Sequence, residues 1–208
     1  MTMKIFLFPF CMFLLTSAFG QNSVTRSLSP FDKIDVAGGY DKITLKEGDT
    51  ENVAIEVSGT DADNILTDVM DNTLRIHMKK GSYQKFKASL TVTYHSLKAV
   101  NNSGSTNIVT ASTIKSDKFA FYSSGSGNFN GNLDVNKVDI AISGSSNMTL
   151  EGRADEQHIA ISGSGDVKAH TLKGKQAEVA ISGSGDVALG VNGSVHSHVS
   201  GSGKVTND

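Results

Sequence analysis

One short phrase returns six times in the second half of the chain: Ser-Gly-Ser, a small residue, then a polar and an apolar residue. Its copies begin at Ser103, Ser124, Ser143, Ser162, Ser182 and Ser200. The intervals between these first serines are 21, 19, 19, 20 and 18 residues. A nearly fixed period of this length is typical of repeat architectures, in which each repeat stacks on its neighbours. The period therefore constrains the fold more than any other feature of the sequence.

The residues around each phrase follow the alternation of a β-strand. The position five residues after the first serine is apolar in all six copies: Ile108, Phe129, Met148, Val167, Val187 and Val205. The position three residues before it is apolar in five copies, from Val100 to Val179, and is Ser197 in the last. Each repeat thus contains a strand, a glycine corner, a second strand and a polar return, such as residues 130–137 or 168–176.

The length of the repeat favours a coil over an array of hairpins. Twenty residues at about 3.3 Å each give roughly 65 Å of path, enough for a turn of two or three short strands. Turns stacked about 4.8 Å apart bury their inward residues against the equivalent residues above and below. We therefore expect an all-β fold, a parallel β-helix with 18–21 residues per coil. Glycine is expected at the corners because the backbone reaches positive φ there.

The region from Pro30 to about residue 100 has strand-like alternation without the repeated phrase. Its apolar positions alternate, as in Val53, Ile55 and Val57, and Gly or Asp turns separate the segments. Residues 61–69 are consistent with a short helical turn, and Asp71-Asn72 with a tight turn between two strands. We predict one domain over 30–208, with a β-rich region at 30–100 continuous with the serial coils at 101–208. Residues 21–29 are expected to form a flexible leader.

The first twenty residues have the layout of a secretory signal peptide. Lys4 precedes an apolar stretch from Ile5 to Leu15, and Ala18-Phe19-Gly20 offers small residues for cleavage before Gln21. The apolar stretch is shorter than the roughly 20 residues that a membrane-spanning helix needs. The only cysteine, Cys11, lies inside this segment. The expected exported chain therefore has no disulfide, and its location is the periplasm, the outer-membrane surface or the extracellular space.

The charge pattern argues against nucleic acid as a partner. The net charge is −2, and no block of like charge occurs along the chain. The second half has no further apolar stretch that would cross a membrane. The strands at 30–100 are expected to cover one end of the coil stack, and Lys204, Asn207 and Asp208 to keep the other end polar. These features predict a monomer or a weak dimer.

The polar position of the phrase forms a column along the stack: Asn107, Asn128, Asn147, Asp166, Asp186 and Lys204. The favoured interpretation is a structural ladder, because Asn and Asp tolerate turn conformations and stacked amides pair between coils. The alternative is a Ca²⁺ site at Asp166 and Asp186, where two carboxylates one coil apart repel each other. The acid occurs in only two of six copies, and Lys204 offsets its charge. We therefore predict no cofactor, and keep Asp166 and Asp186 as the candidate metal ligands.

Two other constellations are relevant to chemistry. His196 and His198 are two residues apart on an expected strand and point to one face, as two zinc ligands must, but the sequence offers no third ligand. Aligned coils would bring Asp139 close to His158, which leaves open a polysaccharide-cleaving site. Isolated charges on solvent-facing returns are usually solvating, so no catalytic residue is assigned.

The chain also resembles a known family. Serial SGSG-D/N corners follow an N-terminal Phe-x-x-Ile-x-Val-x-Gly-Gly segment (31–39), and Asp-Asn-Thr-Leu-x-Ile follows at 71–76. This arrangement is similar to the putative auto-transporter adhesin, head GIN domain family of secreted Bacteroidota-type proteins, over residues 30–205. The resemblance implies a right-handed β-helix outside the cytoplasm and supplies no site residues.

The predicted function is adhesin-like, non-catalytic binding of a glycan or protein ligand at the cell envelope or surface. Two alternatives stay open: a carbohydrate-active enzyme built on a β-helix, and a purely structural component of the envelope.

Overall fold

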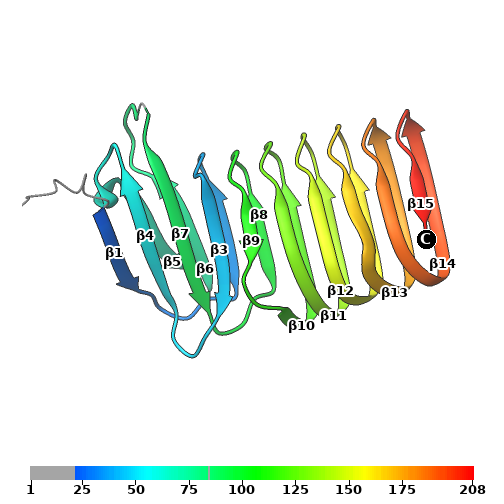
Figure 1. Ribbon diagram of the computed structural model, residues 1–208, viewed down its shortest axis with the longest axis horizontal. Coiled ribbons are helices and arrows are strands. Elements are labelled where there is room, and N and C mark those ends of the chain that lie inside the picture. The colour runs from blue at the N-terminus through cyan, green and yellow to red at the C-terminus, as the bar shows by residue number, and fades with distance from the viewer. Residues whose placement is uncertain (1–21, 84) are drawn as a thin grey trace, which may run out of the picture.

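The computed structural model describes residues 22–83 and 85–208, and these fold into a β-solenoid of about six turns (Figure 1). The predicted parallel β-helix is thereby confirmed. The N-terminal elements are β1 (Asn22–Ser27), β2 (Lys33–Ala37), β3 (Lys42–Glu47), β4 (Asn52–Ser58), a 3-10 helix η1 (Ala62–Asn64), β5 (Ile65–Met70), β6 (Thr73–Met78) and β7 (Lys87–Tyr94). The remaining elements are β8 (Ala99–Asn102), β9 (Ile108–Thr110), β10 (Ile114–Ser123), β11 (Phe129–Ile142), β12 (Met148–Ile161), β13 (Val167–Gly183), β14 (Val187–Gly201) and β15 (Val205–Asn207).

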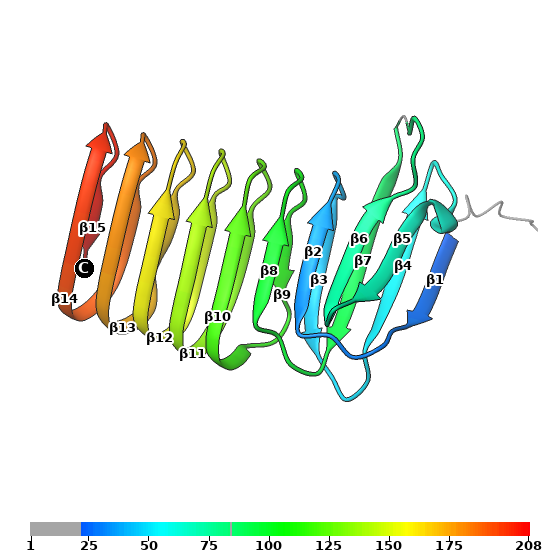
Figure 2. The ribbon, with the colours of Figure 1, turned by 180° about the vertical axis from the view of Figure 1, so that it is seen from behind.

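The solenoid has two long faces that meet at a row of corners. One face contains the strands that enter the corners: β6, β2, β8, β10 and the C-terminal halves of β11 to β14 (Figure 2). The other contains the strands that leave them: β7, β3, β9, the starts of β11 to β14, and β15. Neighbouring coils pair in parallel, for example Phe121 with Ile140 and Ile140 with Ile159. The core lies between the two faces.

Backbone hydrogen bonds continue from coil to coil through the corners. The third residue of each phrase donates its N–H to the carbonyl of the second-position glycine one coil earlier. Ser126 donates to Gly104 at 3.2 Å, and Ser164 donates to Gly144 at 3.0 Å. A parallel ladder is therefore maintained where the chain changes direction, and the corners form a straight row along one edge of the molecule (Figure 1).

Close stacking, rather than backbone conformation, explains the second-position glycine. A Cβ atom on any of the six would lie 1.7–2.3 Å from the carbonyl oxygen of the equivalent glycine in the preceding coil. The expectation of positive φ at this position holds only for the last two copies, Gly183 (152°) and Gly201 (138°). The remaining glycines are needed because any side chain would collide with the neighbouring backbone.

The stack has an additional corner at Gly38 that the six-copy phrase does not include. Ser103 and Ser105 donate their N–H groups to Val36 and Gly38, at 2.9 and 3.1 Å. β2 and β3 thus form a coil directly beneath β8 and β9, and β6 and β7 form another coil beneath β2 and β3. The parallel stack therefore begins within residues 30–100 and not near residue 101. The chain order and the spatial order of these coils also differ.

Antiparallel strands cover the N-terminal end of the solenoid. β4 pairs with β7 and β1 pairs with β4, while β5 pairs with β6. Arg26 on β1 bridges the two layers, because its guanidinium donates to the carbonyls of Ala62 and Ile65 at 2.9 and 2.6 Å. The flexible leader expected over 21–29 is wrong for residues 22–27, since these bonds hold the segment as an edge strand. The predicted signal peptide at 1–20 lies outside the described residues.

Of two local predictions for this region, the tight turn is confirmed, whereas the helical turn expected over 61–69 is confined to η1, because residues 65–69 belong to strand β5. Asp61 caps the 3-10 helix η1, and its carboxylate accepts the N–H of Asp63 at 3.0 Å. Asp71 and Asn72 form the tight turn between β5 and β6, with φ of 50° and 58°. Both residues tolerate the left-handed conformation that such a hairpin turn requires. None of the helices in the described ranges has the length and hydropathy to span a bilayer.

The core is largely apolar along the stack, and it also encloses the buried polar residues Asn102, Thr106, Ser123, Ser146 and Gln157. Phe121 and Phe129 are fully buried and stack with their ring centroids 4.4 Å apart, and Phe119 lies 6.2 Å from Phe129. Phe119 and Phe121 point into the core, and Tyr122 points outward. Tyr40 is also buried, and its hydroxyl has no hydrogen-bond partner among the described residues.

Candidate functional site

A groove runs along the face of the strands that enter the corners, across the coils rather than along them. Its floor is formed by the residues two positions before each first serine. Tyr122, Ala141, Ala160, Ala180 and His198 occupy this position in five successive coils and are aligned by the parallel register. Three consecutive alanines leave a trough between the larger side chains of Tyr122 and His198. Its volume is about 720 Å³.

The first serines of the corners form one wall of this groove. Six of them line it, and all are exposed: Ser103, Ser124, Ser143, Ser162, Ser182 and Ser200. Since the coils repeat about every 4.8 Å, this wall presents a hydroxyl at each step along the groove. The hydroxyl of Ser103 already donates to the carbonyl of Val36 at 3.1 Å, and each of the others is able to donate one hydrogen bond to a ligand and to accept others.

The opposite wall carries alternating acids and histidines. The register aligns Asp139, His158, Glu178 and His196 in four successive coils. The first three of these, with the alanine floor and Tyr122, line a hollow of about 380 Å³ that widens the groove on this side. The groove therefore has an apolar floor between two polar walls.

Ion pairs neutralise the end of the acidic wall nearest Tyr122. The carboxylate of Asp139 lies 2.5 Å from the Nζ of Lys118, 3.8 Å from the Nζ of Lys137 and 3.5 Å from the Nδ1 of His158. Its hydrogen bond and charge raise the pKa of Lys118, whose side chain is largely exposed. The expected proximity of Asp139 and His158 is confirmed. Because Asp139 already has these partners, it does not resemble an isolated general acid.

Tyr122 lies in the floor near one end of the groove, whose lining continues past it to Asn101 and Ser103. It is 44% exposed, and it follows the buried Phe121 in β10. Its ring provides an aromatic surface beside the apolar floor, while its hydroxyl provides a polar tip. This combination is common where one face of a ligand is apolar and its edge is polar.

The candidate metal residues Asp166 and Asp186 lie away from this groove, on the far side of the corners. An oxygen of Asp166 accepts the N–H of Asp186 at 2.9 Å, and an oxygen of Asp186 accepts the N–H of Lys204 at 2.8 Å. Asn147 accepts the N–H of Asp166 at 3.0 Å in the same way. The column is thus a ladder from side chain to backbone, and each acid uses one oxygen in it. Whether the pair binds Ca²⁺ stays a prediction.

The paired histidines are near the last coil of the stack. His196 and His198 lie on β14 and are both exposed, next to Glu178 and Ala180 of β13 in the register. Within residues 22–83 and 85–208, no group of three or more His, Cys, Asp or Glu side chains is arranged to hold a metal ion. A single chain therefore presents these histidines as a pair.

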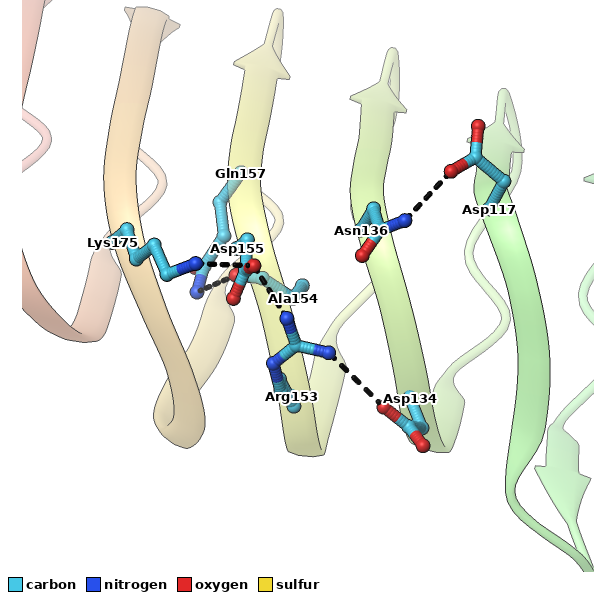
Figure 3. A network of polar contacts seen from close by, with 8 residues as sticks. All are labelled: Asp117, Asp134, Asn136, Arg153, Ala154, Asp155, Gln157 and Lys175. Atoms are coloured by element: carbon cyan, nitrogen blue, oxygen red, sulfur yellow. Dashed lines mark hydrogen bonds and ion pairs between the residues drawn. The ribbon is translucent and has the colours of Figure 1, made fainter.

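The polar returns hold a separate network of charges (Figure 3). Arg153 lies between Asp134, 3.6 Å away, and Asp155, with which it forms a close ion pair, and Lys175 donates to Asp155 at 2.8 Å. These contacts lower the pKa of Asp155, mainly through the hydrogen bond from Lys175. Each pair joins neighbouring returns or residues of one return. The network is therefore suited to fixing the returns rather than to catalysis.

Sequence reasoning missed the alanine floor, although its signal was present. The aligned repeats place one residue of each copy in a column two positions before the first serine, directly after the apolar core position. Its members are Asn101, Tyr122, Ala141, Ala160, Ala180 and His198. Because successive side chains of a strand point to opposite faces, residues next to a core position are expected on the surface. Three small residues in succession, bounded by two large ones, predict a surface trough.

The fold is also found in solved structures of low sequence identity. A "putative adhesin" from Bacteroides fragilis NCTC 9343 matches with a TM-score of 0.77 and 20% identity, over 91% of this chain and 98% of that one. A "putative lipid binding protein" from Parabacteroides distasonis ATCC 8503 matches with a TM-score of 0.70 and 18% identity, over 90% and 96% of the two chains. None of the curated proteins matches this sequence. The family model described as "Putative auto-transporter adhesin, head GIN domain" matches residues 30–207, and the chain therefore belongs to that family.

Proposed function

We propose that this protein is a non-catalytic, adhesin-like binding protein of the cell surface or envelope that holds a linear glycan in the groove of the corner-entering face. The single observation that carries the proposal is the trough over Ala141, Ala160 and Ala180 between two polar walls. Membership of the adhesin family supports a binding role and an extracytoplasmic location.

The lining of the groove favours a glycan over an apolar chain or a flat protein surface. Sugar rings have apolar C–H faces that pack on methyl groups and on Tyr122, while their hydroxyls bind serine hydroxyls and carboxylates. A polymer with repeating units meets a repeating set of walls, because each coil adds one step of about 4.8 Å. The partial neutralisation of Asp139 by Lys118 and Lys137 suits an uncharged polymer.

The test is binding of the folded protein to an array of neutral and charged polysaccharides, with one variant in the groove. Ala160→Arg places a long side chain in the middle of the floor, and we expect a loss of at least about tenfold in affinity, equal to about 1.4 kcal/mol. The matched control is Ala188→Arg, which makes the same change on β14, outside the residues that line the groove. Equal binding by both variants would contradict the proposal, as would binding of a fatty acid but of no glycan.

The runner-up function is a carbohydrate-active enzyme, favoured by the contact between Asp139 and His158 at the groove wall. Such an enzyme would release new reducing ends from the bound polysaccharide, and Asp139→Asn would abolish the release. We expect intact polysaccharide to be recovered after long incubation with the wild-type protein.

A further inference from the structure

We propose that two copies of this chain associate tail to tail through their last coils, and that His196 and His198 of both copies then bind one divalent transition-metal ion such as Zn²⁺. This inference concerns β14 and β15 and does not rest on the glycan proposal, although His198 also lines one end of the groove. The two ends of the stack differ from each other.

The last coil has an outer edge with which no strand of the described residues pairs. β14 pairs with β13 on one side, and β15 pairs with β14. The inward valines of this coil are therefore more exposed to solvent than their equivalents in earlier coils. Val199 is 38% exposed, whereas Ile181, its neighbour in β13, is buried. An exposed parallel edge with apolar residues is a template for pairing with another chain.

The occupant that fits this edge is a second copy in the opposite orientation. The first coil of another copy is already paired, because β4 pairs with β7 and β5 pairs with β6, and that end of the stack presents the antiparallel edge strands β1 and β5 instead of a coil. Two last coils, in contrast, are identical edges, and a two-fold axis perpendicular to the stack pairs them antiparallel. Such self-complementary contacts are the commonest form of homodimer.

The positions of Ser197 and Thr206 allow one axis to serve both faces. Ser197 precedes and Thr206 follows the Gly201-Ser202 corner by four residues each. A two-fold axis that passes between the two copies beside these residues, so that each faces its own equivalent, places Lys204 opposite Asp208 of the second copy, which is a pair of opposite charges. Directly opposed strand residues have Cβ atoms about 4.5–5.5 Å apart, close enough for such pairs to stabilise the contact.

The same axis completes the histidine pair. It places His196 opposite His198 of the second copy, and His198 opposite His196, all on the outer face. The four Cβ atoms then form a rectangle of about 5 Å across the strands and about 6.6 Å along them. Imidazole nitrogens bind Zn²⁺ at about 2.0–2.1 Å, usually in sets of three or four ligands. One chain has two such ligands in sequence, and the second copy supplies the others.

The test is the mass of the full chain by sedimentation or light scattering, in EDTA and in a small excess of ZnCl₂. We expect the mass to double with zinc and to return to that of the monomer with EDTA. Co²⁺ in place of Zn²⁺ is expected to give the visible absorption of tetrahedral nitrogen ligation. His196→Ala and His198→Ala are expected to prevent both effects.

Two further variants separate the metal site from the edge and from adventitious binding. His170→Ala removes an exposed histidine of β13 outside the proposed site and is expected to dimerise like the wild type. Val199→Lys keeps both histidines but puts a charge at the edge, and it is expected to stay monomeric with zinc. A wild-type mass unchanged by zinc would overturn the proposal. A dimer that forms equally in EDTA, or in the His196 and His198 variants, would overturn the metal site.

Discussion

The carbonyl oxygen of Gly38 lies 1.7 Å from the point where a Cβ atom of Gly104 would stand. These two glycines are 66 residues apart in the chain, yet they are equivalent positions of adjacent coils, and Ser105 donates its N–H to Gly38. The contact shows why the second-position glycine recurs. It also joins the N-terminal region to the serial repeats as one stack.

A methyl group at this position should therefore be far more costly than one nearby. Gly104→Ala is expected to lower the free energy of unfolding by about 3 kcal/mol, because backbone on both sides must move to admit the methyl group. Gly39→Ala is the matched control, since a Cβ there meets nothing within 4 Å. We expect it to leave stability unchanged or to raise it by up to about 1 kcal/mol. Urea denaturation of the two variants measures the difference, and equal stabilities would contradict the stacking argument.

The buried hydroxyl of Tyr40 should be dispensable at neutral pH. It has no hydrogen-bond partner among the described residues, so Tyr40→Phe is expected to raise the free energy of unfolding by about 1 kcal/mol at pH 7. Burial also raises the pKa of Tyr40 above the ordinary value of 10.0.

The raised pKa makes stability fall at alkaline pH. The unfolded chain releases the Tyr40 proton near pH 10, while the folded chain keeps it. The contribution of the Tyr40 proton to the free energy of unfolding is therefore complete below pH 10. It declines above pH 10 by up to about 1.4 kcal/mol per pH unit. Burial raises the pKa of Tyr94 too, so the variant should lose only part of this decline. Identical slopes for wild type and Tyr40→Phe above pH 10 would exclude this contribution.

The polar column should behave as a ladder of side-chain acceptors. Asp186→Ala removes the acceptor for the N–H of Lys204 and is expected to cost about 1 kcal/mol, whereas Asp186→Asn keeps an oxygen there and should cost less. Thermal unfolding with and without CaCl₂ tests the alternative. We expect the melting temperature to be insensitive to calcium, and a rise that disappears in Asp166→Asn would instead establish a calcium site.

The ion pairs of the returns should affect a pKa more than stability. Lys175→Met removes the main cause of the lowered pKa of Asp155, so that pKa should rise toward the ordinary value of 3.8. A carboxylate with a lowered folded pKa contributes stability above the unfolded pKa and loses it as pH falls through the folded value. Because Lys175 is exposed and solvent screens its charge, the variant should change the free energy of unfolding only slightly. A carboxyl titration followed by NMR gives the shift, and an unchanged pKa would contradict the assignment.

The aromatic end of the groove offers a further test of glycan binding. Tyr122→Ala is expected to weaken binding several-fold, since aromatic packing contributes about 1 kcal/mol. The control is Tyr83→Ala, which removes an aromatic that packs edge-on against Phe86 far from the groove. Equal binding of the glycan by both variants would show that its binding site does not include Tyr122.

Much of the solenoid could be predicted because its signal is periodic. The phrase from Ser103 onward placed the corners, and the apolar positions beside it placed the core. The Gly38 corner was missed because residues 48–98 intervene before the next coil, so no period connects it to Ser103. Its partner Gly104 is identified only by spatial contact, as are the coil of β6 and β7 and the pairing of β1 with β4.

The candidate site was predicted less well than the fold. The contact of Asp139 with His158 followed from aligning coils, because parallel register carries equal positions of successive repeats side by side. The alanine floor was overlooked because small residues carry no chemistry of their own. It becomes a groove only through larger side chains, which are Tyr122 and His198 in the same column and the wall residues of the neighbouring columns.

The direction of the groove has a consequence for how its specificity can change over generations. Since the floor crosses the coils, duplication of one repeat of about 20 residues would add one further floor position and one further serine, without disturbing the others. Under the proposed function, the length of polymer that the groove contacts would then grow by one coil spacing for each added repeat. Duplication of a repeat within the gene would therefore lengthen the groove and leave the chemistry of its lining unchanged.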